Sequence, residues 1–206
     1  MTLTGDPTLA RSGFDNLPDN PLVLLQKWLE TADSLKVSEP RGFVLSTVNI
    51  SGRPSSRVVL LKTSDEKGVT FTTNQESVKG KNLASNPWAA GTLWWRETIQ
   101  QINFAGRVNL LSSEVADQFF QERTRDAQSV SAISKQSSPL TDERELKEKI
   151  IKLANEKNKI ERPGSWRAYH LILETIEFWQ GCKDRFHKRV RYDLMEGLWH
   201  HQWLQP

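Results

Sequence analysis

The sequence has one cysteine and lacks any segment typical of a targeting signal or a membrane span. Cys182 has no partner for an intramolecular disulfide, which is typical of proteins in a reducing compartment. The segment from Met1 to Pro7 has neither the basic start nor the apolar stretch of a signal peptide. No apolar run reaches the length of a bilayer-spanning helix. We therefore expect a cytoplasmic protein with no membrane partner.

An excess of charge of one sign is also missing. The chain has 28 Lys and Arg against 25 Asp and Glu, and the net charge of +3 is too small to predict a nucleic-acid partner. Metal ligands are sparse as well: His200 and His201 are adjacent and would point to opposite faces of a strand, and Cys182 lacks a CxxC partner. No glycine-rich phosphate loop and no nucleophile elbow occur. We expect no metal site and no dinucleotide loop.

The remaining composition is that of one globular domain, because 206 residues with 37% hydrophobic content can form a sizeable core. Residues 1–18 lack hydrophobic periodicity and are predicted to be a mobile tail, and residues 19–206 to be a single domain. The apolar spacing predicts several short strands with helices between them and no alternation of strand and helix. This pattern predicts an α+β fold, mainly antiparallel, and favours a barrel over a Rossmann sheet. Helices are expected from Asn20-Pro21 onward, over Ser77 to Ser85 and Ser113 to Glu122, and from a Thr141 cap onward. The first helix would have an apolar stripe of Leu22, Leu25 and Leu29, and the last a buried stripe of Leu146, Ile150 and Leu153.

Several polar segments, far apart in the chain, make joint sense around one phosphorylated aromatic ligand. They offer cations for a phosphate, amides for the edge of a heteroaromatic ring, and an indole for its face. Flavin mononucleotide (FMN) requires this combination. The segments hold Arg57, Val58, Val59, Leu60 and Lys62; Thr72, Thr73, Ser77 and Lys79; Gln101; Gln136 and Ser137; and Trp179, Arg185, His187 and Arg189.

Each segment taken alone also fits an ordinary structural role. The stretch from Arg57 to Lys62 could be a core strand with solvated ends, Ser134 to Ser138 a linker, and Arg185 to Arg189 a basic surface strand. On a strand, Arg57 and Lys62 point to opposite faces, so one ligand reaches both only at a strand edge or where a second subunit covers both faces. Arg185 and His187, two apart, would share a face of an extended segment.

Taken together, the segments resemble the pyridoxamine-phosphate-oxidase-like family of flavoproteins, from about Leu17 to Pro206. The resemblance implies an FMN-binding split β-barrel that forms a homodimer, with two FMN sites shared at the subunit interface. It implies that Gln136, Ser137 and Trp179 serve the flavin that the other subunit holds mainly through Arg57 and Lys62. In the family an arginine commonly precedes the phosphate-binding lysine. Here Val78 takes that place, so phosphate binding depends more on Arg57 and Lys79.

Two branches of the family differ at the substrate. The branch that oxidises pyridoxine phosphate holds its phosphate with a lysine, a tyrosine, an arginine and a serine, which correspond to Lys62, Phe119, Arg123 and Ala127. Both cations are retained and both hydroxyl donors are absent, which suits a flat carboxylate better than a phosphate ester. Arg185 and His187 are expected beside the substrate, with His187 as the candidate for proton transfer.

The resemblance therefore implies an FMN-dependent oxidase that aromatises dihydro- or tetrahydrophenazine carboxylates, a small-molecule substrate of three fused rings. Hydride would pass to the flavin, and O₂ would reoxidise it with release of H₂O₂. Two alternatives stay open: a pyridoxine/pyridoxamine 5′-phosphate oxidase, and a flavin-binding protein of the same fold without catalysis.

Overall fold

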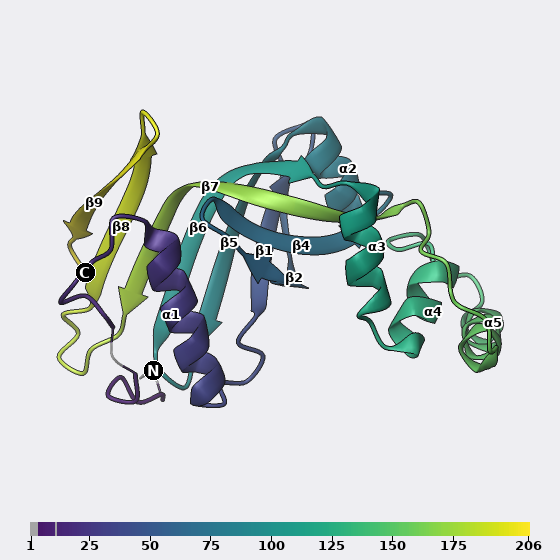
Figure 1. The fold of residues 1–206 in the computed structure, drawn as a ribbon, viewed down its shortest axis with the longest axis horizontal. Helices are drawn as coiled ribbons and strands as arrows, with labels where there is room; N and C mark the ends of the chain where they lie inside the picture. The colour runs from purple at the N-terminus through teal and green to yellow at the C-terminus, as the bar shows by residue number, and fades with distance from the viewer. Residues whose placement is uncertain (1–3, 11) are drawn as a thin grey trace.

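The protein is described here by a computed structural model, which covers residues 4–10 and 12–206 (Figure 1). Its helices are α1 (Pro21–Ser34), α2 (Val78–Ser85), α3 (Ser113–Gln121), α4 (Arg125–Ile133) and α5 (Glu143–Asn155). Its strands are β1 (Gly42–Val48), β2 (Pro54–Leu60), β3 (Thr63–Ser64), β4 (Gly68–Asn74), β5 (Trp88–Trp95), β6 (Gln100–Leu110), β7 (Trp166–Gln180), β8 (Lys188–Met195) and β9 (Leu198–Leu204).

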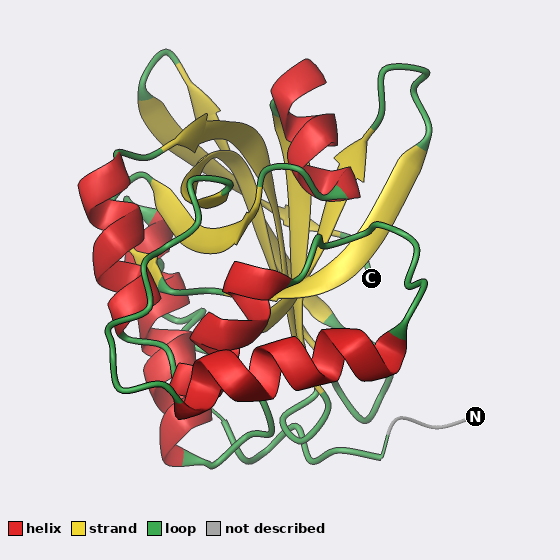
Figure 2. Cartoon of the chain, turned by 90° about the vertical axis from the view of Figure 1, so that its right-hand side faces the viewer, coloured by secondary structure: helices red, strands yellow, loops and turns green. Residues whose placement is uncertain are grey.

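All of these strands belong to one antiparallel sheet that curls back on itself. Its order is β2-β1-β5-β6-β7-β4-β3, and the β8–β9 hairpin is added to β7. The first and last strands of this order are joined by only Leu61 and Lys62, and the Lys62 N–H donates to the Thr70 carbonyl on β4 at 2.7 Å. Figure 2 shows the curl behind the helices at one end of the molecule. The predicted mainly antiparallel α+β fold is confirmed.

The longest strand, β7, connects the two ends of the molecule. Its first half pairs with β4 and its second half with β8, while β6 pairs with it along most of its length. The β6–β7 register shifts between Ala105 and Gly106, which marks a β-bulge. A side chain at Gly106 would lie 1.8 Å from the Ile172 carbonyl oxygen, so only glycine allows the two strands to approach this closely.

Helix α1 covers one side of the curled sheet and completes the core. It begins as predicted, with the Asn20 side chain accepting from the Leu22 N–H and Pro21 in the first turn. The predicted stripe of Leu22, Leu25 and Leu29 is buried, as is Trp28 beside it. The Trp28 ring lies 5.2 Å from that of Phe178 on β7, an edge-to-face contact that joins helix to sheet.

The core extends upstream of residue 19, where we expected the domain to begin. Phe14 is only 6% exposed and packs against Trp28. The Trp28 indole N–H donates to the Ser12 carbonyl at 2.7 Å, and the Asp6 N–H donates to the Glu97 carbonyl at 2.8 Å. The mobility of the N-terminal segment stays a prediction, but its described part lies against the domain.

Three details of the helical end differ from the predictions. Helix α4 was not expected, and α5 is capped by Asp142, whose carboxylate accepts from the Glu145 N–H, rather than by Thr141. Its predicted apolar stripe is only partly buried, because α5 packs on α4 at the edge of the molecule and not on the sheet (Figure 1). Among the described residues, no helix is long and apolar enough to cross a membrane.

Candidate functional site

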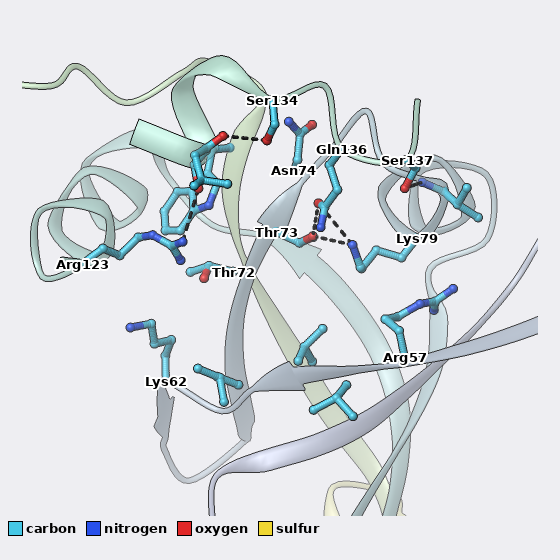
Figure 3. Close-up of a pocket in the computed structure, with 17 residues that line it drawn as sticks. Arg57, Lys62, Thr72, Thr73, Asn74, Lys79, Arg123, Ser134, Gln136 and Ser137 are labelled. Atoms are coloured by element: carbon cyan, nitrogen blue, oxygen red, sulfur yellow. Dashed lines mark hydrogen bonds between the residues drawn. The ribbon is translucent and has the colours of Figure 1, made fainter. Parts of the chain in front are cut away.

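A cavity of about 570 Å³ opens between β2, β4, the start of α2, and the segment that carries α4 and the loop after it (Figure 3). This size falls within the range of small-molecule sites. The predicted site residues that line it are Arg57, Val58, Val59, Leu60, Lys62, Thr72, Thr73, Lys79, Arg123, Gln136 and Ser137. Val78 and Ser134, which belong to segments that the sequence already assigned to the ligand, line it too. So do Asn74, Val130, Ser131 and Trp166, which the sequence reasoning did not place there.

Arg57 on β2 and Lys62 just after it line the same cavity because β2 is at an edge of the sheet. Strand β2 is the first in the sheet order, and among the described strands it pairs only with β1. It ends at Leu60, and Lys62 follows the buried Leu61, so the chain has left the strand before Lys62. One ligand can therefore contact both Arg57 and Lys62, because it would lie at the edge of the sheet where β2 ends.

Arg57 and Lys79 form one pole of the cavity, at the right of Figure 3. The Arg57 guanidinium donates to the hydroxyls of Thr47 at 2.7 Å and Ser55 at 2.6 Å, which fix its direction. Lys79 is 7% exposed, and its ammonium donates to the Thr73 hydroxyl at 3.0 Å and the Ser77 hydroxyl at 3.1 Å. Ser77 does not line the cavity but orients the lysine that does.

The charge of this pole is uncompensated. Burial, and secondarily the repulsion of Arg57, lowers the pKa of Lys79 from 10.5 to about 8. Within the described part of the chain, no carboxylate forms an ion pair with Arg57 or Lys79. The Ser77 hydroxyl also caps α2, so the positive end of the helix dipole lies here. Two cations and a helix N-terminus together have the chemistry that favours an anion such as phosphate.

Lys62 and Arg123 form a second pole, at the left of Figure 3. The Lys62 ammonium lies 5.8 Å from the centre of the Phe119 ring, and the Arg123 guanidinium carbon lies 5.3 Å from that of Trp166. Burial lowers the pKa of Arg123. In the described residues neither cation has a carboxylate partner. The cavity thus has a pair of cations at each end.

The loop after α4 folds back on the cavity of its own chain. The Gln136 side-chain oxygen accepts from the Lys79 ammonium at 3.3 Å, and the Ser137 hydroxyl accepts from the Val78 N–H at 3.3 Å. Ser137 has φ +73°, a left-handed conformation that costs a non-glycine residue energy and marks a constrained loop. We expected Gln136 and Ser137 to reach the other subunit's flavin. Within one chain, contacts with α2 hold both residues beside the Lys79 of that chain.

A second group of predicted residues lies at the far end of β7, away from this cavity. Trp179 pairs with Gln101 on β6 and with Arg189 on β8. The His187 ring is 4.7 Å from the Trp179 ring. Figure 1 shows that this end of β7, where β8 begins, is opposite the end that carries α3, α4 and α5. One chain therefore brings together only part of the predicted site.

The residues after β7 do not form the extended segment that we expected. Arg185 has φ +67°, and the His187 N–H donates to the Arg185 carbonyl at 2.9 Å, so the chain turns between them and the two side chains do not share a strand face. The His187 Nδ1 accepts from the Cys182 N–H at 3.0 Å, which leaves Nε2 to carry the proton of the neutral ring. Arg189 is already paired with the Glu177 carboxylate at 2.8 Å.

Comparison with known proteins gives a consistent result over the whole chain. The profile of the family described as pyridoxamine 5′-phosphate oxidase matches residues 30–156, and that of the pyridoxine 5′-phosphate oxidase C-terminal dimerisation region matches residues 166–206. The dihydrophenazinedicarboxylate synthase of Pseudomonas chlororaphis is 36% identical over 205 residues, covering 100% of this chain and 92% of the relative. The pyridoxine/pyridoxamine 5′-phosphate oxidase of Mannheimia succiniciproducens is 41% identical over 189 residues, covering 91% and 90%.

A solved structure matches the chain over nearly its whole length. The crystal structure of PhzG from Burkholderia lata 383 in complex with tetrahydrophenazine-1-carboxylic acid superposes with a TM-score of 0.94, at 35% sequence identity, and the match covers 98% of this chain and 100% of that one. This likeness confirms the predicted split-barrel fold.

Proposed function

Because the chain belongs to the pyridoxamine 5′-phosphate oxidase family of flavin-dependent oxidoreductases, we propose that it is an FMN-dependent oxidase that aromatises reduced phenazine carboxylates. The observation that carries this proposal is the chemistry of the Lys62–Arg123 pole. Two half-buried cations lie there beside the Phe119 and Trp166 rings. Phe119 and Ala127 stand where the pyridoxine-phosphate branch has hydroxyl donors.

The Arg57–Lys79 pole fits the phosphate of FMN. A dianionic phosphate would compensate two cations that have no carboxylate partner in the described residues, and the Thr73 and Ser77 hydroxyls hold the Lys79 ammonium in place. Bound here, FMN would supply the redox chemistry, taking up the hydride of the reduced ring and passing the electrons to O₂ to give H₂O₂. The distance between the two poles separates the cofactor phosphate from the substrate anion.

Lys62 and Arg123 would bind the substrate carboxylate. The guanidinium presents a planar donor edge, and its hydrogen bonds within the described residues come from Nη2, so Nη1 is left to donate to a ligand. The neighbouring aromatic rings provide apolar surface for a flat tricyclic molecule. In a substrate that becomes aromatic on losing hydride, holding the ring in place is the protein's main task.

The remaining residues would come from a partner subunit of a homodimer. Gln101, Trp179, Arg185, His187 and Arg189 lie outside their own chain's cavity, and the profile match at residues 166–206 is to a dimerisation region. In that arrangement Trp179 would cover the flavin, and His187, whose Nδ1 accepts from the Cys182 N–H, would present its Nε2–H to the substrate as a hydrogen-bond donor. A reducing cytoplasm suits the single cysteine.

A pyridoxine/pyridoxamine 5′-phosphate oxidase is the second candidate, since a relative of that kind is 41% identical and both anion-binding cations are retained. Aerobic turnover separates the two. The FMN-loaded protein is mixed with reduced phenazine carboxylates or with pyridoxine phosphate, and H₂O₂ and the oxidised products are measured against a flavin-free control. Efficient oxidation of pyridoxine phosphate, with phenazine oxidation no faster than in the control, would refute the proposal. Turnover of neither would indicate a flavin-binding protein without catalysis.

A further inference from the structure

Ser131 lies on α4, inside the cavity and beside Arg123. Its hydroxyl oxygen is 3.3 Å from the Arg123 Nη2, which donates to it. The same nitrogen donates to the Ala127 carbonyl at 3.2 Å. Two neutral acceptors from consecutive turns of α4 therefore hold the guanidinium against the Trp166 ring. Neither acceptor compensates its charge.

The Ser131 hydroxyl keeps a hydrogen for a ligand. A hydroxyl can accept one hydrogen bond and donate another, and in the described structure this one accepts from Arg123. An anion held by Lys62 and Arg123 would complete the arrangement, taking the hydroxyl hydrogen together with the guanidinium donors. Ala127, one turn earlier, presents only a methyl group and a carbonyl.

The position of this hydroxyl also bears on which anion fits. Residues 131, 134 and 136 line the cavity in succession, and Gln136 contacts the Lys79 ammonium. A hydroxyl at position 131 is thus about 6 Å along the helix, one turn nearer to the Lys79 pole than a hydroxyl at position 127. A carboxylate attached directly to a ring has a shorter reach than a phosphate ester, so the shift favours the carboxylate.

We propose that Ser131 is a specificity-determining residue that donates to the carboxylate of the substrate and fixes Arg123 toward it. This inference rests on the proposed function, and the class of ligand it selects is a flat aromatic ring bearing a carboxylate directly on the ring. Ser131 would thus provide the substrate carboxylate with a hydroxyl donor that Phe119 and Ala127 cannot provide.

Equilibrium binding of an oxidised ligand tests Ser131 without turnover. FMN-loaded wild type and Ser131→Ala are titrated with phenazine-1-carboxylate, and the flavin spectrum reports binding. The Kd is expected to rise about 5- to 10-fold in Ser131→Ala, the range for losing a hydrogen bond to a charged group that is partly solvated. Phenazine, which lacks the carboxylate, should bind both proteins within about twofold, because the lost bond involves only the carboxylate. Ser131→Thr keeps the hydroxyl and should retain most of the wild-type affinity.

Ser129→Ala is the matched control, since the Ser129 hydroxyl donates to the Arg125 carbonyl within α4 and does not line the cavity. It should bind both ligands as wild type does. The assignment is overturned if Ser131→Ala raises the Kd for both ligands equally or leaves both Kd values unchanged. It is overturned too if the wild type binds neither ligand. The two proposals can also fail separately. If the Kd for phenazine-1-carboxylate rises in Ser131→Ala but the wild type oxidises no reduced phenazine, the proposed function is refuted and the role of Ser131 in binding the carboxylate is supported.

Discussion

The depressed pKa of Lys79 makes the affinity for FMN depend on pH in a defined window. Because burial and Arg57 lower this pKa to about 8, the flavin-free protein loses the Lys79 proton above that pH. A phosphate beside the ammonium favours the charged form, so FMN binding above pH 8 must take up a proton. At pH 9 only about one flavin-free molecule in eleven carries the charge, and the Kd for FMN should be about tenfold higher than at pH 7.

Replacing the lysine removes both the affinity and its dependence on pH. Lys79→Met should raise the Kd at pH 7 by about 10- to 150-fold, the equivalent of about 1.5–3 kcal/mol for a hydrogen bond to a charged group. Its Kd should then stay flat between pH 7 and 9. Lys81→Met is the control, because Lys81 is exposed on the same helix and lies outside the cavity. Fluorescence titration of FMN measures all three proteins across this range.

Two results would contradict this reasoning. One is a wild-type Kd that does not change between pH 7 and 9, and the other is a rise of the same size in Lys79→Met. The flavin-free protein supplies a second readout. Since its folded state binds this proton less tightly than the unfolded chain does, its stability should increase as the pH rises from about 8 toward 10.5, and Lys79→Met should lose this increase.

Three further variants test other parts of the structure. Phe14→Ala, at a residue that packs between Trp28 and Trp203, should cost about 3 kcal/mol in urea unfolding, and a cost below about 1 kcal/mol would show that the N-terminal segment is not part of the core. Glu196→Asn should raise stability by about 0.5–1 kcal/mol in thermal unfolding, because Glu196 has φ +53° in a two-residue hairpin turn with Gly197; an unchanged stability would contradict this. Phe119→Tyr combined with Ala127→Ser should raise kcat/KM for pyridoxine phosphate, about fivefold for each hydroxyl regained, and no gain would mean that those hydroxyls do not set the choice of substrate.

The parts of the fold that follow from local chemistry could be predicted from the sequence. Asn20, Pro21 and three leucines at helical spacing define α1 within one stretch of chain, and Ser77 caps α2 in the same local way. Helix α4 could not be predicted, because the residues it buries are Gln128 and Ser129 and give no apolar stripe.

The site depends more on long-range contacts than the fold does. Gln136 meets Lys79 only because a loop 57 residues further along the chain turns back over the cavity, and no spacing in the sequence encodes that path. Arg185 was expected on an extended segment, yet its backbone is left-handed, a conformation that a non-glycine residue does not signal. Ser131 was missed because its helix was missed.

The length of β7 has a consequence for how two copies of this chain would act together. Trp166 at its start lines the cavity, and Trp179 near its end contacts His187. A strand of 15 residues spans about 50 Å, and its pairing with β6 leaves it little freedom to slide. In the proposed homodimer, each β7 would contribute one end to its own cavity and the other end to its partner's. Ligand binding in one cavity would then affect ligand binding in the other through the two shared strands. An insertion within β7 would disturb both sites at once, whereas an insertion in the α4–α5 loop would disturb a single site.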